Sequence, residues 1–517
     1  MKSSQLKWGI ILSYGSMILS TLISLVYTPF MLRKLGQSEY GLYQIVYSVV
    51  NYLNLLNLGF SGAYIKFYTR YSIKNDEKGV KTLNGMFLLF YLCIAGIAII
   101  IGTVLNFNLD LIFGRSLTAK ELHTAKYLMS LMVINLAITF PATVFTGNIS
   151  ANEKFIFQRT VTLLSSILNP ILSVILLTIG FKSIGLVIGA TINTCLCFVI
   201  NMYFCVKKLK FKFSFHNIPL RLFKEVAVFS AFILLSRMID EINWGVGKVV
   251  LGAVAGTVEV SVFGLASQLN TYYLRFSTAI STVFIPKVNQ IVEKYEGNER
   301  NQVLTQLFIK VGRLQFFVMS FILIGYIVFG QEFIAIWAGE NYRRSYFAGL
   351  FLMIPVTVPL IQNIGIEIQI AQNKHKFRSL IYACIAICNI IISVILSQKI
   401  GAIGPAIATA ISLLCGNGIL MNIYYHKKIG LNIIKFWKNI LKIIPSFIIP
   451  IIIGTLIKKV IVIGSYFALL QCGIIYSFAY CICVIIFAMN TEEKNMVLAS
   501  LQKFIKREKN NGCNNNS

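Results

Sequence analysis

Five residues with charged or aromatic side chains gather within one apolar stretch near the middle of the chain: Arg237, Asp240, Glu241, Trp244 and Lys248. On a helix four of them fall within about 40° of one line, and Asp240 lies about 60° to its side. Fixed cations on such a stripe can bind a phosphate, and carboxylates can bind a small cation or a proton. An internal Arg–carboxylate network that only fastens helices together is the alternative interpretation.

Two further groups could contact a polar ligand. Arg275 lies in the next apolar stretch, where it can face the protein interior or reach the membrane surface with its long side chain. Tyr47, Asn51 and Asn54 recur at i, i+4 and i+7 and form a polar stripe on one helix face. Amides and phenols on one face suit hydroxyl-rich ligands, although hydrogen bonds between helices would explain each Asn as well.

The composition indicates a membrane protein. Of 517 residues, 56% are hydrophobic and 13% are charged, and the mean hydropathy is +0.74. A soluble chain carries about 25% charged residues, so these values exclude a water-soluble enzyme. The net charge of +28 would suggest nucleic acid in a soluble protein. In a membrane protein it indicates basic cytoplasmic loops that are attracted to anionic lipids, and no nucleic acid partner is expected.

Hydropathy predicts an all-α integral membrane protein with about 14 transmembrane helices, because a span needs about 20 apolar residues. The predicted spans are 9–32, 40–63, 82–104, 125–147, 161–180, 184–204, 225–253, 258–285, 308–330, 346–368, 379–397, 403–425, 441–457 and 464–488. With the N-terminus inside, about 33 Lys and Arg residues are cytoplasmic and about 11 are external. Both termini are therefore predicted to face the cytoplasm.

A weak internal repeat at an offset of about 220 residues predicts the domain organisation. The run from Glu39 to Tyr43 matches the run from Glu259 to Phe263, and Ile184-Gly185 recurs as Ile403-Gly404. Six spans separate the equivalents, so the two copies enter the membrane from the same side and leave a central cavity between them. The predicted parts are an N-terminal six-helix lobe (1–207), a basic cytoplasmic linker (208–224), a C-terminal six-helix lobe (225–427), transmembrane helices 13 and 14 (428–489) and a disordered cytoplasmic tail (490–517).

The sequence lacks the motifs for nucleotide hydrolysis, metal binding and hydrolytic catalysis. Gly247-Lys248 is followed by Val249 where a phosphate-binding loop needs Ser or Thr. No His, Cys and carboxylate set has the spacing of a metal or catalytic centre, so neither a metal nor a cofactor is expected. Work against a gradient would need an ion gradient, with Na⁺ or H⁺ as the coupling ion.

The stretch Tyr27-Thr28-Pro29-Phe30-Met31-Leu32-Arg33-Lys34-Leu35-Gly36, followed by Glu39-Tyr40-Gly41-Leu42-Tyr43, resembles the start of the polysaccharide transporters. These are Wzx-type flippases of lipid-linked oligosaccharides, in the superfamily that includes multidrug and toxin extruders and the lipid II flippase. The stretch from Asp240 to Gly252 also resembles the family's acidic-Trp-Lys-Leu-Gly pattern. Relatives often carry a second acidic residue where this chain has Gly247, which puts ion coupling in question.

The resemblance implies a bacterial cytoplasmic membrane protein that moves an undecaprenyl-pyrophosphate-linked oligosaccharide to the outer leaflet by alternating access. Its product would enter a capsule, an O-antigen or another envelope polymer, and the pathway's polymerase and glycosyltransferases would be partners. The predicted diphosphate-binding residues are then Arg237, Lys248 and Arg275. The predicted ion-coupling pair is Asp240 and Glu241, and the residues predicted to face the glycan are Tyr47, Asn51, Asn54 and Trp244.

Two alternatives remain from the sequence. A multidrug extruder of the same superfamily shares the cavity but favours an acidic one for cationic drugs. A polytopic oligosaccharide polymerase would need a large outer loop, and the largest predicted one, near Asn106–His123, has about twenty residues. The sequence favours a transporter rather than an enzyme.

Overall fold

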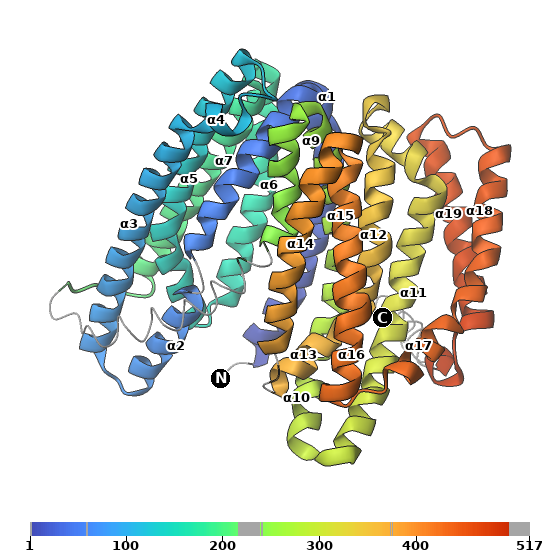
Figure 1. The fold of residues 1–517 in the computed structure, drawn as a ribbon. Coiled ribbons are helices and arrows are strands. Elements are labelled where there is room, and N and C mark those ends of the chain that lie inside the picture. The colour runs from blue at the N-terminus through green and yellow to red at the C-terminus, as the bar shows by residue number, and fades with distance from the viewer. Residues whose placement is uncertain are drawn as a thin grey trace, which may run out of the picture. The chain divides into compact units, whose positions relative to one another are not determined.

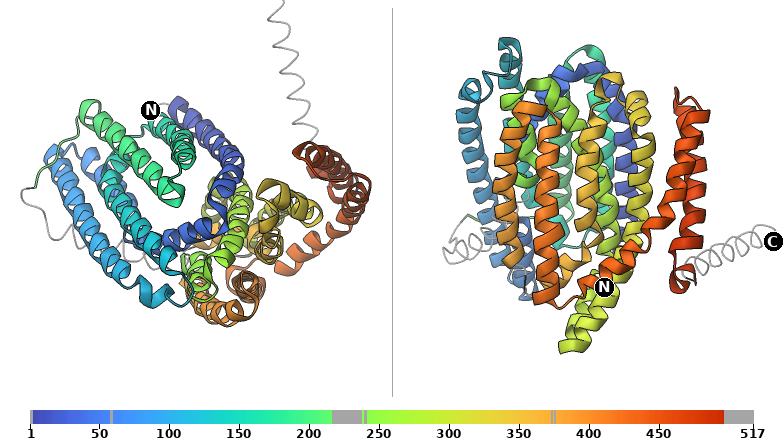
Figure 2. Two further views of the ribbon diagram at one scale, coloured as in Figure 1. Left: turned by 90° about the horizontal axis from the view of Figure 1, so that it is seen from above. Right: turned by 45° about the vertical axis from the view of Figure 1, so that its right-hand side comes forward.

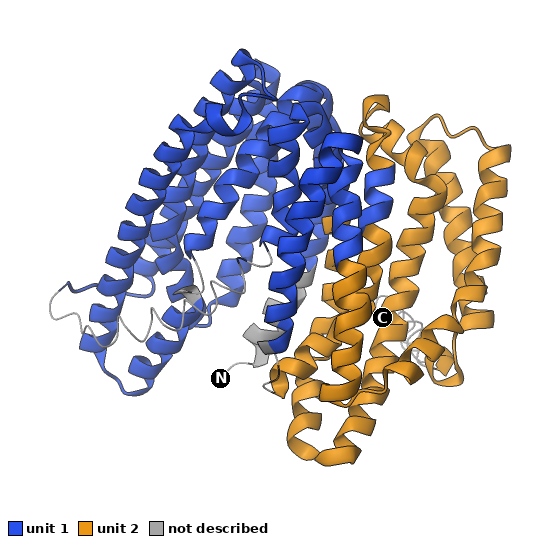
Figure 3. Cartoon of the chain, viewed as in Figure 1, with its two compact units in different colours: residues 1–269, 347–352, 377–412 blue, residues 270–346, 353–376, 413–517 orange. Residues whose placement is uncertain are grey.

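The computed structural model describes residues 3–57, 60–215, 238, 241–372, 374 and 376–495. All regular secondary structure in these ranges is helical (Figure 1). Contacts divide the chain into two units (Figure 3). Unit 1 comprises Met1–Leu269, Phe347–Leu352 and Phe377–Ser412, and unit 2 comprises Asn270–Tyr346, Met353–Lys376 and Leu413–Ser517. The boundaries of the two predicted lobes stay a prediction.

The helices of the first half are α1 (Ser3–Asn54), α2 (Phe60–Ile73), α3 (Glu77–Phe107), α4 (Leu109–Phe113), α5 (Ala119–Ala151), α6 (Phe155–Ile179) and α7 (Lys182–Lys207). A further helix covers 241–254. Within unit 1, α5 packs between α3 and α7, and α6 packs on α1 and α7. Buried apolar side chains from α1, α2, α3, α5 and helix 241–254 form one continuous core.

The later helices are α9 (Gly256–Thr282), α10 (Ile285–Lys294), α11 (Gly297–Trp337), α12 (Ser345–Ile361), α13 (Ile364–Ala371), α14 (Lys376–Ile400), α15 (Ile403–Leu413), α16 (Asn422–Tyr424), α17 (Ile433–Leu441), α18 (Ile448–Val460) and α19 (Tyr466–Cys483). In unit 2, α18 and α19 lie side by side (Figure 2). Aromatic side chains of α19 fill the core between this pair and α11.

Helix α1 is too long to be one transmembrane span. Its 52 residues would extend about 78 Å, whereas the apolar part of a bilayer is about 30 Å thick. The helix bends at Gly36, whose φ of 75° and ψ of 175° are accessible to glycine and strained for other residues. The bend separates the two apolar segments that hydropathy predicts as the first two spans.

Ten helices in the described residues are long and apolar enough to cross a membrane, or eleven if the bent pair of α12 and α13 is one span. The prediction of 14 spans differs for three reasons. Gly15–Ile73 counts as a single candidate although it contains the bend at Gly36. Helix α9 falls outside the candidates, and residues 225–237 of the predicted seventh span lie outside the described residues. The layout of 14 helices stays a prediction.

The first residues of the predicted disordered tail are ordered instead. Residues 491–495 form a helical turn, and Glu493 is buried. Its carboxylate binds Arg313 of α11 through two bonds of 2.7 Å each. This correction has a physical reason, since a buried bidentate ion pair orders a segment that composition alone leaves polar. Residues 496–517 of the predicted tail lie outside the described residues.

Candidate functional site

A polar cavity of 310 Å³ lies inside unit 1, among α1, α5, α6 and α7. Its lining comprises Tyr43, Tyr47, Val50, Asn51, Asn54, Met132, Asn135, Leu136, Thr139, Asn169, Val187, Ala190, Asn193 and Thr194. Most of these side chains end in a hydroxyl or an amide, and none of the fourteen carries a charge. The cavity volume lies at the lower end of the range of about 300–1,000 Å³ for ligand pockets.

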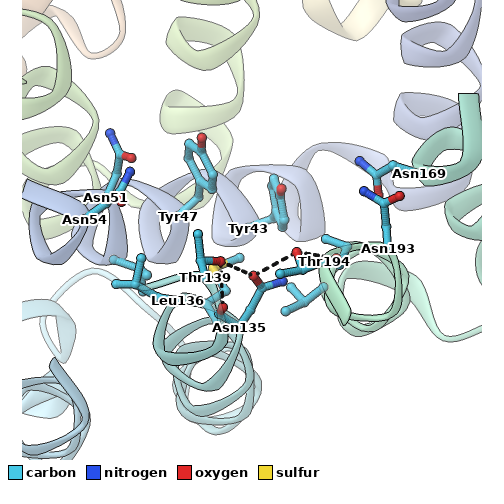
Figure 4. Close-up of a pocket in the computed structure, with 14 residues that line it drawn as sticks. Tyr43, Tyr47, Asn51, Asn54, Asn135, Leu136, Thr139, Asn169, Asn193 and Thr194 are labelled. Atoms are coloured by element: carbon cyan, nitrogen blue, oxygen red, sulfur yellow. Dashed lines mark hydrogen bonds between the residues drawn. The ribbon is translucent and has the colours of Figure 1, made fainter. Parts of the chain in front are cut away.

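Hydrogen bonds fix one wall of this cavity (Figure 4). Asn135 of α5 donates through Nδ2 to Thr191 Oγ1 at 3.0 Å and accepts at Oδ1 from Thr194 Oγ1 at 3.3 Å. Asn193 Nδ2 donates to Ser165 Oγ at 2.8 Å. These bonds hold α5, α6 and α7 together and leave some amide groups of the wall free for a ligand.

Two features of the lining are suited to a ligand. The Oδ1 atom of Asn169 is buried and has no hydrogen-bond partner among the described residues. A buried polar atom without a partner costs about 1–3 kcal/mol, and a ligand donor in the cavity would remove that cost. On the opposite wall, the rings of Tyr43 and Tyr47 stack with centroids 5.9 Å apart (Figure 4).

Three of the four residues predicted to face a glycan line this cavity: Tyr47, Asn51 and Asn54. Trp244 is 39% exposed and is not among the lining residues. The sequence did not point to Tyr43 on the same helix, nor to the polar residues of the other walls, which are Asn135, Thr139, Asn169, Asn193 and Thr194. The i, i+4 pair of Asn135 and Thr139 was the available signal, and no pattern in the sequence linked it to α1.

Glu241 and Lys248 lie on helix 241–254 and both contact α1. Asn51 donates through Nδ2 to Glu241 Oε1 at 2.7 Å, so a residue of the cavity wall also holds this carboxylate. Lys248 Nζ donates to Gln44 Oε1 at 3.0 Å. The Lys248 residue is partly buried, and within the described residues Gln44 is the hydrogen-bond partner of its ammonium group. An ammonium has three donors, which leaves two for a bound anion.

The bond between Lys248 and Gln44 begins a chain of side-chain hydrogen bonds through unit 1. Gln44 Nε2 donates to the Tyr40 hydroxyl at 2.8 Å, which donates to Gln268 Oε1 at 3.2 Å. Gln268 Nε2 then donates to Thr28 Oγ1 at 3.0 Å. Thr28 and Tyr40 lie on opposite sides of the bend at Gly36, so the chain links the bend to helix 241–254.

Gly247, where relatives often carry an acidic residue, lies in a tight contact. A Cβ atom at this position would come within 2.9 Å of Pro405 Cβ and 3.0 Å of the Phe263 ring. Real Cβ atoms rarely come so close to their neighbours, so only glycine fits without movement of α9 or α15. Close helix packing thus accounts for the departure from the family pattern.

Arg275, a further predicted site residue, is not among the residues that line this cavity. Arg275 lies on α9 in unit 2, is exposed, and places its guanidinium 5.9 Å from the Tyr272 ring centroid. Arg237 and Asp240 lie outside the described residues. Across the part of the chain that the structure describes, no cluster of three or more His, Cys, Asp or Glu residues could hold a metal ion.

A polar contact joins three helices near one end of unit 1. Ser38 Oγ donates to Glu121 Oε1 at 2.6 Å, and Thr257 Oγ1 donates to the same oxygen at 2.8 Å. Glu121 also forms a capping box with Thr118 at the start of α5, which fixes the carboxylate in place. The contact joins α1 just after the bend, the start of α5 and the start of α9.

Comparison with solved structures defines the class of protein. The chain superposes on the lipid II flippase MurJ in an inward closed conformation with a TM-score of 0.72 at 19% identity, covering 92% of this chain and 98% of that chain. An inward-facing multidrug resistance MATE family transporter of the MOP superfamily gives a TM-score of 0.63 at 13% identity, covering 83% and 99%. The protein is a multi-pass membrane protein with the fold of the MOP superfamily transporters.

Sequence comparison identifies the family. The family model described as polysaccharide biosynthesis protein matches residues 6–292, and the chain belongs to that family. A relative from Bacillus subtilis, the uncharacterized membrane protein EpsK, is 22% identical over 94% of this chain and 96% of its own length. A putative O-antigen transporter from Shigella flexneri is 20% identical over 78% and 94%. Polysaccharide transporters of the MOP superfamily are thus confirmed as the relatives of this chain.

Proposed function

We propose that this protein moves an undecaprenyl-pyrophosphate-linked oligosaccharide from the cytoplasmic to the outer leaflet of a bacterial cytoplasmic membrane by alternating access. The observation that carries the proposal is the uncharged polar cavity of unit 1, in a chain of the polysaccharide biosynthesis family. Hydroxyl and amide groups both donate and accept hydrogen bonds, as sugar hydroxyls do. An uncharged lining of this kind can therefore bind the hydroxyl groups of a neutral glycan.

The same lining argues against the multidrug extruder. A cationic drug buried in a membrane protein needs a carboxylate to compensate its charge. Among the fourteen described residues that line the cavity, none is acidic, and Glu241, which accepts a hydrogen bond from the lining residue Asn51, is not one of them. The cavity therefore suits a neutral glycan better than a cation.

In this proposal the diphosphate of the lipid is bound by Lys248 together with Arg237 and Arg275, and Asp240 with Glu241 couples transport to Na⁺ or H⁺. The contacts of Lys248 support a role in diphosphate binding, because its ammonium has two donors beyond the bond to Gln44. Both chain termini face the cytoplasm, as the excess of Lys and Arg on that side requires. The transported glycan then passes to the polymerase and glycosyltransferases of a capsule or O-antigen pathway.

The test is flipping in proteoliposomes with two fluorescent lipids, one with the oligosaccharide and one with undecaprenyl pyrophosphate alone. The wild type should move both lipids. Asn169→Leu should slow the glycan-bearing lipid at least tenfold and leave the bare lipid unchanged, because Asn169 lines the proposed glycan cavity and its Oδ1 has no partner among the described residues. Lys248→Gln should slow both lipids, because it removes a cation from the shared diphosphate.

Three results would contradict the proposal. The first is a wild type that moves neither lipid but extrudes cationic dyes, which would identify an extruder. The second is a wild type that lengthens the glycan instead of moving it, which mass spectrometry of the product would detect and which would identify a polymerase. The third is an equal effect of Asn169→Leu on both lipids, which would separate the cavity from glycan binding.

A further inference from the structure

A second cavity, of 440 Å³, lies at the lysine-rich end of unit 1. It is lined by Tyr68, Ser72, Asn75, Asp76, Glu77, Val80, Lys81, Asn84, Asn148, Leu209, Lys210, Phe211 and Lys212. These residues come from the end of α2, the start of α3, the end of α5 and an extended segment, 209–215, that follows α7. The polar cavity among α1, α5, α6 and α7 shares none of these residues.

Segment 209–215 is fixed to the helix ends. The Ser214 backbone N–H donates to the Lys81 carbonyl at 2.9 Å, and Asn84 Nδ2 donates to the Lys212 carbonyl at 2.8 Å. Phe211 is buried, with its ring centroid 5.3 Å from that of Phe145. Lys210 adopts a left-handed conformation with a φ of 52°. The backbone that carries the two lysines is thus held in one place.

The charges of this cavity favour an anion. Asp76 Oδ1 accepts from the Gly79 N–H at 2.8 Å as the N-cap of α3. Glu77 pairs with Lys81 at 3.4 Å. These carboxylates are therefore engaged within α3 and its cap. Lys210 and Lys212 are exposed lining residues whose side chains have no partner among the described residues, so both ammonium groups are available to a ligand in the cavity.

The surroundings place the cavity at the level of lipid headgroups. Phe213 and Phe215 are 53% and 45% exposed, and their ring centroids lie 5.2 Å apart. Lysines beside the end of an apolar span are typical of the membrane–water interface, and exposed Phe side chains next to them can enter the boundary between headgroups and acyl chains. Helix α3, whose first turns line the cavity, continues into one of the candidate spans.

We propose that this cavity binds the phosphate-bearing headgroup of an anionic phospholipid, with Lys210 and Lys212 on the phosphate and the polar side chains of α2 and its turn on the headgroup hydroxyls. Phe213 and Phe215 would contact the acyl-chain boundary. The ligand is a lipid rather than a soluble phosphate because exposed aromatic rings flank the lysines. This inference does not depend on the substrate of the transporter.

The test is native mass spectrometry of the purified full-length chain with phosphatidylglycerol, phosphatidylcholine and glycerol phosphate. The variant is Lys210→Gln with Lys212→Gln, and the matched control is Lys207→Gln with Lys208→Gln, which removes the same charge from exposed residues just before the segment. Each lysine near a membrane surface contributes about 1 kcal/mol to the binding of anionic lipid, so the loss of two corresponds to about thirty-fold in lipid affinity. Phosphatidylglycerol should bind the variant about thirty-fold more weakly, and the control should bind it as the wild type does.

Phosphatidylcholine should bind all three proteins equally, and glycerol phosphate should not displace the lipid. Equal losses in the variant and the control would show diffuse surface attraction and overturn the site. Unchanged binding in the variant would overturn it as well. Displacement by glycerol phosphate at equal concentration would show that the cavity binds a soluble phosphate.

Discussion

Tyr40 joins two hydrogen bonds of the chain that runs from Lys248 to Thr28. Its hydroxyl accepts from Gln44 and donates to Gln268, and the side chain is 0% exposed. A buried amide that loses its partner has no water to replace it. The position of Lys248 therefore depends on a residue that no ligand would touch.

Tyr40→Phe should lower the free energy of unfolding by about 1 kcal/mol, because it deletes only the hydroxyl and leaves two amides short of a partner. Denaturation in mixed micelles measures this change. Tyr203→Phe on α7 is the control, since Tyr203 is 64% exposed. Equal stability of the two variants would show that the chain of hydrogen bonds contributes nothing measurable.

At the scale of elements, Arg313 fastens the chain after α19 to α11. Besides the two bonds to Glu493, its guanidinium donates to the Asn439 carbonyl at 3.1 Å and to the Ala488 carbonyl at 2.8 Å. It also lies 5.6 Å from the Phe317 ring centroid. One buried side chain thus connects α11, α17 and the end of the α18–α19 pair within unit 2.

Glu493→Gln should destabilise unit 2 by about 3–5 kcal/mol, because it leaves the buried Arg313 without a counter-charge. Hydrogen exchange at the end of α19 should rise in the same variant. Glu492→Gln is the matched control, because the Glu492 side chain is 82% exposed and its bond to Lys310 is 3.8 Å long. If both variants exchange alike, the buried ion pair does not order this segment.

At the scale of the whole molecule, two carboxylates of unit 1 that are separated by the offset of the predicted repeat make similar hydrogen bonds. Glu39 accepts from Ser183 Oγ at 2.5 Å, at the start of α7. Glu259, 220 residues later, accepts from the backbone N–H of Ala402, 219 residues after Ser183, at 2.6 Å. Equivalent contacts at nearly one offset are what a parallel duplication predicts.

If the protein works by the proposed alternating access, the polar contact of Ser38, Glu121 and Thr257 is expected to open during transport. Ser38 Oγ and Thr257 Oγ1 are 3.4 Å apart, close enough for a disulfide after substitution. Ser38→Cys with Thr257→Cys should cross-link on oxidation, stop flipping, and recover on reduction. Each single substitution serves as the control for the native cysteines. A cross-linked protein that still moves lipid would contradict opening at this end.

Hydropathy and helical periodicity predicted the all-helical membrane class and the polar face of the helix that carries Tyr47, Asn51 and Asn54. Hydropathy located the apolar segments because burial in a bilayer depends on composition over about 20 residues. The polar stripe of Tyr47, Asn51 and Asn54 was readable because helical periodicity places i, i+4 and i+7 on one face. Resemblance over the first spans gave the family, which the comparisons confirm.

Which helix faces contact one another could not be predicted from the sequence and became visible in the folded chain. The cavity joins that stripe to Asn135, Asn169 and Asn193, and the partner of Lys248 is a glutamine 204 residues away. Periodicity fixes the direction of a side chain relative to its own helix but not the neighbour that it contacts. The helical turn around Glu493 was not predicted for the same reason, because it is held by Arg313, which lies on a helix far away in the sequence.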